Sequence, residues 1–255
     1  MKAILLSGIN DLKMLDIPIP QPAPGEILLR TASVGICGSD VHYYKEGGTG
    51  GAALDQPFTL GHEFSAYIES GKEKGRLASV DPALSCGDCE YCLEGNPNFC
   101  LNLSFAGAEG IDGGLREYVS WPEKAVFPLP DNFTPEEGAL LEPLGVAIHA
   151  LHLGKIFPGM DVGVFGAGPV GLLTIQMAKA AGASRIFVTD KLSHRLEYAK
   201  ECGATDILLA DGSEAKSILQ ATQKRGLDVV FEAAGDDGSA VETAVETSKR
   251  GAMVV

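Results

Sequence analysis

The sequence lacks any hydrophobic run approaching the roughly 20 apolar residues that a membrane-spanning helix needs. The apolar stretch at residues 1–6 is interrupted by Lys2 and followed by polar residues. It is therefore too short for the hydrophobic segment of a signal peptide, and it fits a first β-strand better. We expect a cytoplasmic protein whose thiols stay reduced and which has no membrane partner.

Positive charge is also scarce. There are 20 Lys and Arg residues against 34 Asp and Glu residues, which gives a formal net charge of −14. A field of this sign repels phosphate backbones and anionic lipids, so we do not expect nucleic acid as a partner. The simplest interpretation of the acidity is solubility. Hydrophobic residues make up 45% of the 255 residues, which is typical of one or two globular domains.

The pattern of residues divides the chain near residue 145. The first part, 1–145, is rich in Gly and Pro and contains short apolar stretches such as 27–29 and 117–119, which predict an irregular all-β domain. In 146–255, short strands alternate with helical patterns. This alternation predicts a doubly wound α/β domain with a parallel sheet.

The strands of the second domain can be placed from their apolar runs, and Gly182 and Gly203 are typical of the ends of the first two helices that follow the glycine-rich turn. The predicted strands cover 162–165, 185–189, 206–209, 227–232 and 252–255. A complete dinucleotide-binding sheet of this kind has six strands. Because the sequence ends inside the fifth predicted strand, we expect a truncated domain.

A glycine motif follows the first of these strands. Gly166, Gly168 and Gly171 form G-x-G-x-x-G between a strand and a helix, and Asp190 ends the next strand about 20 residues further on. The first glycine permits a tight turn, the second lets the pyrophosphate approach, and the third lets helix and strand pack closely. The helix N-terminus would then bind the phosphates. The alternative is a glycine turn that binds nothing.

The charge near this motif bears on the choice of cofactor. Asp190 would accept hydrogen bonds from the adenosine ribose and would repel the 2′-phosphate of NADP, so the sequence favours NAD. Lys191 and Arg195 lie nearby and leave NADP as the less favoured cofactor.

Four of the six cysteines lie within residues 86–100. Cys86, Cys89, Cys92 and Cys100 have the spacing C-x2-C-x2-C-x7-C. Four thiolates from one short loop can surround a zinc ion with no open position, so we predict a structural zinc site. Two disulfides and an iron–sulfur cluster are the alternatives. A reducing cytosol disfavours the first, and no redox partner domain is visible for the second.

A second candidate metal site is scattered along the first domain. Cys37, His62, Glu63 and Glu142 supply a thiolate, an imidazole and carboxylates, which would leave a position open for substrate as a catalytic zinc requires. Spacing alone leaves simpler interpretations open, because a lone Cys is usually a buried apolar group and a loop His is usually hydrogen-bonded.

Five motifs occur in the order found in one enzyme family. They are Gly-Ile-Cys-Gly-Ser-Asp-Val-His-Tyr-Tyr (35–44), Gly-His-Glu (61–63), the four-cysteine loop, Gly-Ala-Leu-Leu-Glu-Pro-Leu (138–144) and Gly-Ala-Gly-Pro-Val-Gly (166–171). Together they resemble the zinc-containing medium-chain alcohol dehydrogenases. The resemblance is strongest to the sorbitol and xylitol (polyol) dehydrogenase branch, near the threonine and butanediol dehydrogenases. It implies a GroES-like catalytic domain, a Rossmann domain, two zinc ions, and NAD.

The resemblance also implies a role for each matching residue. Cys37, His62 and Glu63 look like the ligands of the catalytic zinc, with Glu142 as a direct or water-mediated fourth ligand. Asp40 matches the carboxylate that orients the ligand His. These roles imply the oxidation of an alcohol or polyol by hydride transfer to NAD.

Three further residues match positions around the substrate. Ser39 resembles the hydroxyl that contacts the alcohol, His42 the outer end of a proton relay, and Tyr43 a residue of the pocket wall. An ordinary loop hydrogen bond is the alternative for each of these side chains. Pro169 and Val170 complete the cofactor turn, with Arg195 beside it.

The sequence departs from the family pattern in three places. Ala66 replaces a glycine, the segment 71–76 is shorter, and the part that completes the nucleotide sheet and forms the dimer edge is missing after Val255. The homo-oligomer usual in the family is therefore doubtful here. An open sheet edge predicts low stability. The rival hypothesis is thus a non-catalytic remnant that keeps the structural zinc and binds nucleotide. A zinc-free quinone reductase fits less well, because Cys37, His62 and the cysteine loop are intact.

Overall fold

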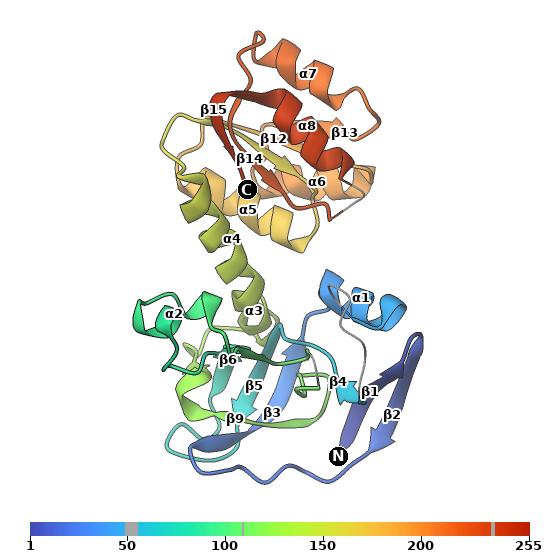
Figure 1. The fold of residues 1–255 in the computed structure, drawn as a ribbon, viewed down its shortest axis with the longest axis vertical. Coiled ribbons are helices and arrows are strands. Elements are labelled where there is room, and N and C mark those ends of the chain that lie inside the picture. Colours follow the sequence, from blue (N-terminus) through green and yellow to red (C-terminus); the bar gives the residue numbers. More distant parts are fainter. Residues whose placement is uncertain (49–55, 109, 236–237) are drawn as a thin grey trace. The chain divides into compact units, whose positions relative to one another are not determined.

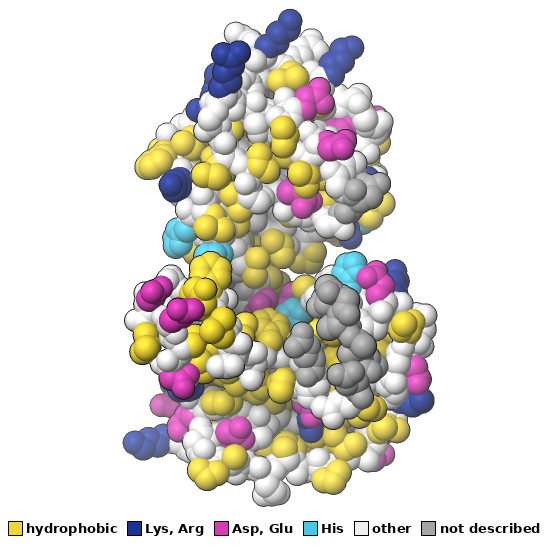
Figure 2. Space-filling model, viewed as in Figure 1, with side chains coloured by type: hydrophobic (Ala, Val, Ile, Leu, Met, Phe, Trp, Pro, Cys, Tyr) yellow, Lys and Arg dark blue, Asp and Glu magenta, His cyan; other side chains and the backbone are white. Residues whose placement is uncertain are grey.

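The computed structural model describes residues 1–48, 56–108, 110–235 and 238–255. The chain divides into two compact units, Met1–Glu142 and Pro143–Val255 (Figure 1). The division lies within helix α4 (Leu141–Gly154), close to the expected boundary after residue 145. In the described part of the chain, no helix is long and apolar enough to cross a membrane. On the face drawn in Figure 2, acidic side chains are spread over the surface rather than gathered in one patch.

The first unit is built on a five-stranded antiparallel sheet with the order β10-β6-β5-β3-β9. Its strands are β10 (Val126–Pro128), β6 (Leu77–Val80), β5 (Phe64–Ile68), β3 (Glu26–Val34) and β9 (Tyr118–Pro122). Ile27 and Leu29 alternate with more exposed residues along β3, so one face of the strand packs into the core with Phe64 and Trp121.

Two smaller sheets complete the β-structure of this unit. A three-stranded sheet has the order β2-β1-β4 and a two-stranded sheet pairs β7 with β8. Their strands are β1 (Lys2–Gly8), β2 (Asp11–Asp16), β4 (Phe58–Thr59), β7 (Ala83–Leu84) and β8 (Ser104–Phe105). The first strand predicted at residues 1–6 is thus present, and the predicted all-β character of this unit is confirmed.

Short helices place the candidate ligands of the first unit. They are α1 (Gly38–Glu46), α2 (Glu90–Leu93), α3 (Pro135–Ala139) and the 3-10 turns Pro97–Phe99 and Glu123–Ala125. Cys37 caps the N-terminus of α1, and the helix ends at Gly47, whose φ of 81° places it in the left-handed region. Thr134 and Glu137 form a capping box that starts α3 and so leads the chain towards Glu142.

The shortened segment 71–76 forms the tight connection between β5 and β6. The N–H of Ile68 donates to the carbonyl of Arg76 at 3.0 Å, and the N–H of Gly75 donates to the carbonyl of Ile68 at 2.7 Å. This turn follows β5, whereas the Gly-His-Glu motif immediately precedes it. The turn is therefore at the other end of the strand from the candidate ligands. Ala66 is fully buried in β5.

The second unit contains a parallel sheet with the order β13-β12-β11-β14-β15. The strands are β11 (Asp161–Phe165), β12 (Arg185–Asp190), β13 (Asp206–Leu209), β14 (Leu227–Glu232) and β15 (Ser248–Val254). The helices are α5 (Pro169–Ala180), α6 (Ser193–Cys202), α7 (Glu214–Ala221) and α8 (Ser239–Thr247). The predicted doubly wound architecture is confirmed.

Both faces of this sheet are covered by helices. Val164 and Val188 pack with residues of α5 and α6, whereas Phe187 and Val230 pack with residues of α7 and α8. Such two-sided burial explains why the strands are nearly continuous apolar runs. Gly182 and Gly203 follow the last residues of α5 and α6 with φ values of 89° and 118°, as expected at helix ends.

Candidate metal centres and cofactor pocket

Three side chains that are distant in sequence converge in the first unit. Cys37 lies at the start of α1, and His62 and Glu63 directly precede β5. One ligand atom from each of these three residues lies within 4.8 Å of the others. His62 and Glu63 are only 6% and 8% exposed. The predicted grouping of these three residues is thus present in the fold.

Burial and mutual contact shift the protonation of these groups. The hydrogen bond with His62 lowers the pKa of Cys37, and contacts with Ser39 add to this effect against the opposing effect of burial. Burial acts to lower the pKa of His62, but the hydrogen bond to Cys37 and the negative charges of Asp40 and Glu142 outweigh it and raise the pKa. These directions favour a thiolate on Cys37 beside an imidazolium on His62, a pair whose charges cancel.

Burial also affects the two candidate carboxylates. Burial raises the pKa of Glu63, opposed by the positive charge of His62. Burial also raises the pKa of Glu142, at the start of α4, against the opposing charge of His62, but Glu142 is not among the three residues whose ligand atoms lie within 4.8 Å of one another. Burial of the Glu63 carboxylate, 8% exposed, beside Cys37 is costly unless a cation or a proton compensates its charge. A thiolate, an imidazole and carboxylates form a donor set that suits zinc.

Two residues hold this donor set in place. The Asp40 carboxylate, 3% exposed, accepts the N–H of Cys37 at 2.8 Å and the N–H of Gly61 at 3.1 Å, and its Oδ1 lies 3.8 Å from Nδ1 of His62. This position fits the predicted orienting role, which stays a prediction. Position 35 has room only for glycine, because a Cβ there would lie 2.2 Å from Oε2 of Glu63. Sequence reasoning did not single out Gly35 as the contact of Glu63.

The three residues expected around the substrate have different surroundings. Ser39 is half-buried and contacts Cys37. His42 is exposed, with Nδ1 3.0 Å from Oε1 of Glu46 one helical turn later. Tyr43 is 6% exposed, and its ring packs edge-on against Phe58 with centroids 5.6 Å apart. Their proposed roles with an alcohol stay predictions.

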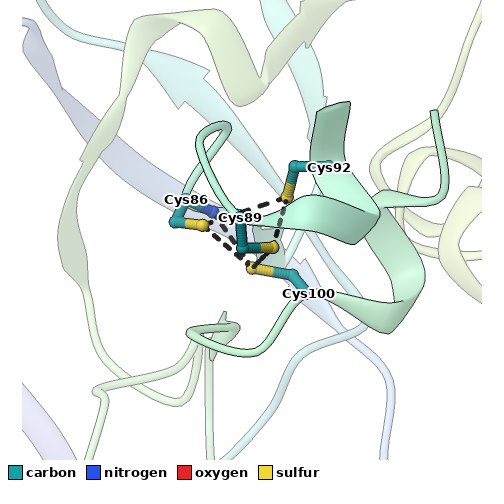
Figure 3. Close-up of side chains that lie close together, drawn as sticks. All are labelled: Cys86, Cys89, Cys92 and Cys100. Carbon is teal, nitrogen blue, oxygen red and sulfur yellow. Dashed lines mark hydrogen bonds between the residues drawn. The ribbon is translucent and has the colours of Figure 1, made fainter. Parts of the chain in front are cut away.

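The four clustered cysteines point their sulfur atoms towards one another (Figure 3). The Sγ–Sγ distances are 3.4 Å for Cys89–Cys92 and for Cys86–Cys100, and 4.0 Å for Cys86–Cys92 and for Cys89–Cys100. Four thiolates at tetrahedral corners about 2.3 Å from a zinc ion would be about 3.8 Å apart. The observed spacing fits this ion, and all six cysteines of the chain are free thiols.

Backbone groups favour the thiolate form at part of this cluster. The N–H groups of Cys86 and Asn102 donate to Sγ of Cys100 at 3.2 Å and 3.4 Å, and these contacts lower the pKa of Cys100. Backbone hydrogen bonds from Leu101 and Cys92 lower the pKa of Cys89 to about 6. Burial raises the pKa of Cys92, so the four thiols do not all ionise readily without a cation among them.

The glycine motif of the second unit has the geometry that its three positions require. Gly166 has a φ of 102°, and a Cβ there would lie 2.6 Å from the peptide between Ala233 and Ala234. A Cβ on Gly171 would lie 2.0 Å from the carbonyl oxygen of Gly166, so only glycine lets α5 pack this closely on the turn. Gly168 caps α5, and a Cβ there would meet open space, which leaves room for a ligand at the helix N-terminus.

A cavity of about 580 Å³ adjoins this turn. Its walls include Gly166, Gly168, Asp190 and Arg195, which were predicted to bind the cofactor, together with residues of α8 that sequence reasoning missed. Asp190 is 7% exposed and accepts the N–H of Ala167 and the N–H of Leu192, both at 2.8 Å. Nη1 of Arg195 lies 3.7 Å from Oδ2 of Asp190.

Two family models match the chain. Residues 23–131 match the alcohol dehydrogenase GroES-like domain, and residues 169–255 match the zinc-binding dehydrogenase family. Among curated relatives, sorbitol dehydrogenase of Bacillus subtilis is 38% identical over 98% of this chain and 73% of its own length. The probable D-xylulose reductase A of Neosartorya fischeri is 37% identical over 99% of this chain and 74% of its own length.

Solved structures agree with this fold. A zinc-binding dehydrogenase from Sinorhizobium meliloti, bound to NADP, has a TM-score of 0.89 and 32% identity. An alcohol dehydrogenase from Escherichia coli, complexed with NADH, has a TM-score of 0.89 and 30% identity. The matches cover 99% and 100% of this chain, respectively, and 75% of each solved chain.

Proposed function

This chain belongs to the zinc-binding alcohol dehydrogenase family, and on that premise we propose that it oxidises a secondary alcohol or polyol by hydride transfer to NAD. One observation carries the proposal: Cys37, His62 and Glu63 converge within 4.8 Å, and His62 and Glu63 are buried. Structural zinc sites typically use four thiolate or imidazole ligands, whereas a carboxylate among the ligands is found in catalytic sites. The identity of the relatives as sorbitol dehydrogenase and D-xylulose reductase supports a polyol as the substrate class.

The first unit would supply the alcohol-binding site. Cys37, His62 and Glu63 would hold a catalytic zinc ion, with Glu142 as a fourth ligand directly or through water. When bound, zinc would lower the pKa of an alcohol held there, and NAD would accept the hydride that the alcohol carbon loses. Ser39 would accept the alcohol proton, and exposed His42 would pass it to solvent with Glu46 as its hydrogen-bond partner.

The four-cysteine loop would hold a second, structural zinc ion. The second unit would bind the dinucleotide, with its pyrophosphate at the N-terminus of α5 beside Gly168 and its adenosine ribose at Asp190. Pro169 and Val170 form the first residues of α5 and would complete the turn around the phosphates.

The substrate class can be tested directly. Purified protein is assayed for NADH formation with sorbitol, xylitol, 2,3-butanediol and threonine. The proposal expects the highest kcat/KM with a polyol. Turnover confined to threonine or butanediol would move the chain to the neighbouring branches, and zinc binding without turnover on any alcohol would favour a non-catalytic protein.

The preference for NAD gives a prediction at Asp190. Replacing Asp190 with Asn removes the charge that repels the 2′-phosphate of NADP but keeps one acceptor oxygen. We expect the ratio of kcat/KM for NADP to that for NAD to rise by about ten- to a hundredfold. At an effective dielectric constant of about 20, the repulsion between two close negative charges amounts to a few kcal/mol, which corresponds to a change of this size.

The ratio of kcat/KM for NADP to that for NAD is the informative quantity in this experiment. Asn cannot accept both the N–H of Ala167 and the N–H of Leu192, so D190N also loosens the turn, but this affects both cofactors alike because they share the pyrophosphate. Glu201→Gln removes a carboxylate from the exposed surface of α6 and serves as the control. An unchanged ratio in D190N would show that Asp190 does not select the cofactor.

A further inference from the structure

Two acidic residues stand on either side of the glycine turn. The turn follows β11, which lies between β12 and β14 in the sheet. The last residue of β12 is Asp190 and the last residue of β14 is Glu232. In a parallel sheet these carboxyl ends meet at the edge where ligands bind. The glycine motif implies a role for Asp190 but none for Glu232.

Glu232 binds the backbone of the loop that follows its own strand. Its Oε1 accepts the N–H of Ala234 at 2.7 Å and the N–H of Gly235 at 3.1 Å. The N–H of Ala233 donates to the carbonyl of Phe165 at 2.7 Å, so the loop is also tied to the end of β11. One carboxylate thus satisfies two consecutive N–H groups that would otherwise face solvent or a ligand.

The loop held by Glu232 packs directly against the cofactor turn. The peptide between Ala233 and Ala234 lies where a Cβ of Gly166 would be, at 2.6 Å from Ala233 C and O and from Ala234 N. Both alanines line the cavity of about 580 Å³. The N–H of that same peptide is the one that Glu232 holds at 2.7 Å. The orientation of this peptide and the position of Gly166 are therefore coupled through Glu232.

We propose that Glu232 is a positioning residue of the dinucleotide site. It holds the glycine turn in place from β14, as Asp190 holds it from β12. The inference rests on the proposed binding of NAD in the cavity. Asp190 holds Ala167 through one carboxylate oxygen, and Glu232 holds the peptide packed on Gly166. With the hydrogen bonds of both carboxylates in place, the N–H groups at the start of α5 are fixed before the phosphates bind. Preorganisation of this kind lowers the entropic cost of binding.

The test compares Glu232→Ala with Glu232→Gln. Alanine removes both hydrogen bonds, whereas glutamine removes the charge and keeps an acceptor oxygen at the same position. Because both hydrogen bonds that hold the loop are lost, we expect the Kd for NAD, measured by titration calorimetry, to rise about ten- to a hundredfold in E232A. In E232Q we expect it to stay within about threefold of the wild type.

Two further measurements separate positioning from general damage. Amide hydrogen exchange of Ala234 and Gly235, followed by NMR in the protein without cofactor, is expected to accelerate in E232A and to stay slow in E232Q. Zinc content and the Tm of the first unit are expected to match the wild type in both variants. Glu201→Ala, which removes an exposed carboxylate from α6, is the control and should leave the Kd unchanged.

The outcomes distinguish this inference from the proposed function. If the wild type does not bind NAD, the proposed function fails, while the exchange rates still report whether Glu232 holds the loop. If the wild type binds NAD and E232A binds it equally well, Glu232 does not position the site. An E232Q variant as weak as E232A would also overturn the proposal, because the acceptor oxygen would then not be the property that matters.

Discussion

Replacing Cys37 with Ser is expected to reduce alcohol oxidation by at least about a thousandfold, because an alcohol without the metal keeps a pKa near that of water, about 16. Serine differs from cysteine only in having a smaller oxygen atom in place of the sulfur. Its hydroxyl, however, does not ionise near neutral pH and is a poor zinc ligand. The thiolate of Cys37 is the donor whose pKa the contact with His62 lowers. We therefore expect the variant to lose one of two zinc ions per chain, as measured by elemental analysis.

The matched control is Cys202→Ser, which makes the same atomic change on α6 of the second unit. Cys202 packs beside the apolar core there, and its pKa is raised by burial rather than lowered. Activity and zinc content are expected to stay at the wild-type level in C202S. A C37S variant that keeps both zinc ions and its activity would show that Cys37 is not a ligand of a catalytic metal.

Replacing Cys100 with Ser is expected to release the other zinc ion and to lower the Tm of the first unit by about 10 °C, because loss of a structural metal costs several kcal/mol. Cys100 is the buried member of the four-cysteine cluster, with sulfur contacts to Cys86 at 3.4 Å and to Cys89 at 4.0 Å. The loop around it has little apolar support, since Leu93 and Leu101 are 75% and 67% exposed. The metal would therefore be the main element that holds the loop.

Differential scanning calorimetry with and without a chelator measures this effect. Removal of zinc from the wild type should shift its transition towards that of C100S, whereas C37S should keep a transition near the wild-type value. The two cysteine variants thus separate the sites, because one loses activity with little loss of stability and the other loses stability first. Two zinc ions retained in C100S would contradict the structural assignment.

Most of the second unit could be predicted because its elements depend on local patterns. Strands 206–209 and 227–232 were predicted with the bounds that the structure has, since each is a mostly apolar run, and the second is buried along nearly its whole length. The strand predicted at 252–255 instead begins at Ser248, because it opens with polar residues and contains Gly251 at a φ of 77° near an irregular register. These three polar residues and the glycine look like a turn in sequence.

The contacts of the candidate sites were harder to predict because they depend on residues that meet only in the folded chain. The spacing of the cysteine loop sufficed, since its four thiols come from one short segment. Nothing local shows that Gly35 must lack a side chain to admit the Glu63 carboxylate. Glu232 also gave no motif signal, although its position at the end of a parallel strand beside the glycine turn could have suggested it.

The most direct test of the proposed polyol oxidation follows the hydride itself. Carbon-deuterated sorbitol or xylitol is incubated with the purified full chain and NAD, and the reduced cofactor is analysed by mass spectrometry. If the chain transfers hydride from the polyol to NAD, the wild type yields reduced cofactor with one deuterium on the nicotinamide ring, and the amount of reduced cofactor falls at least about a thousandfold in C37S. Reduced cofactor without deuterium, or no deuterium transfer from any polyol in protein that carries two zinc ions, would contradict it.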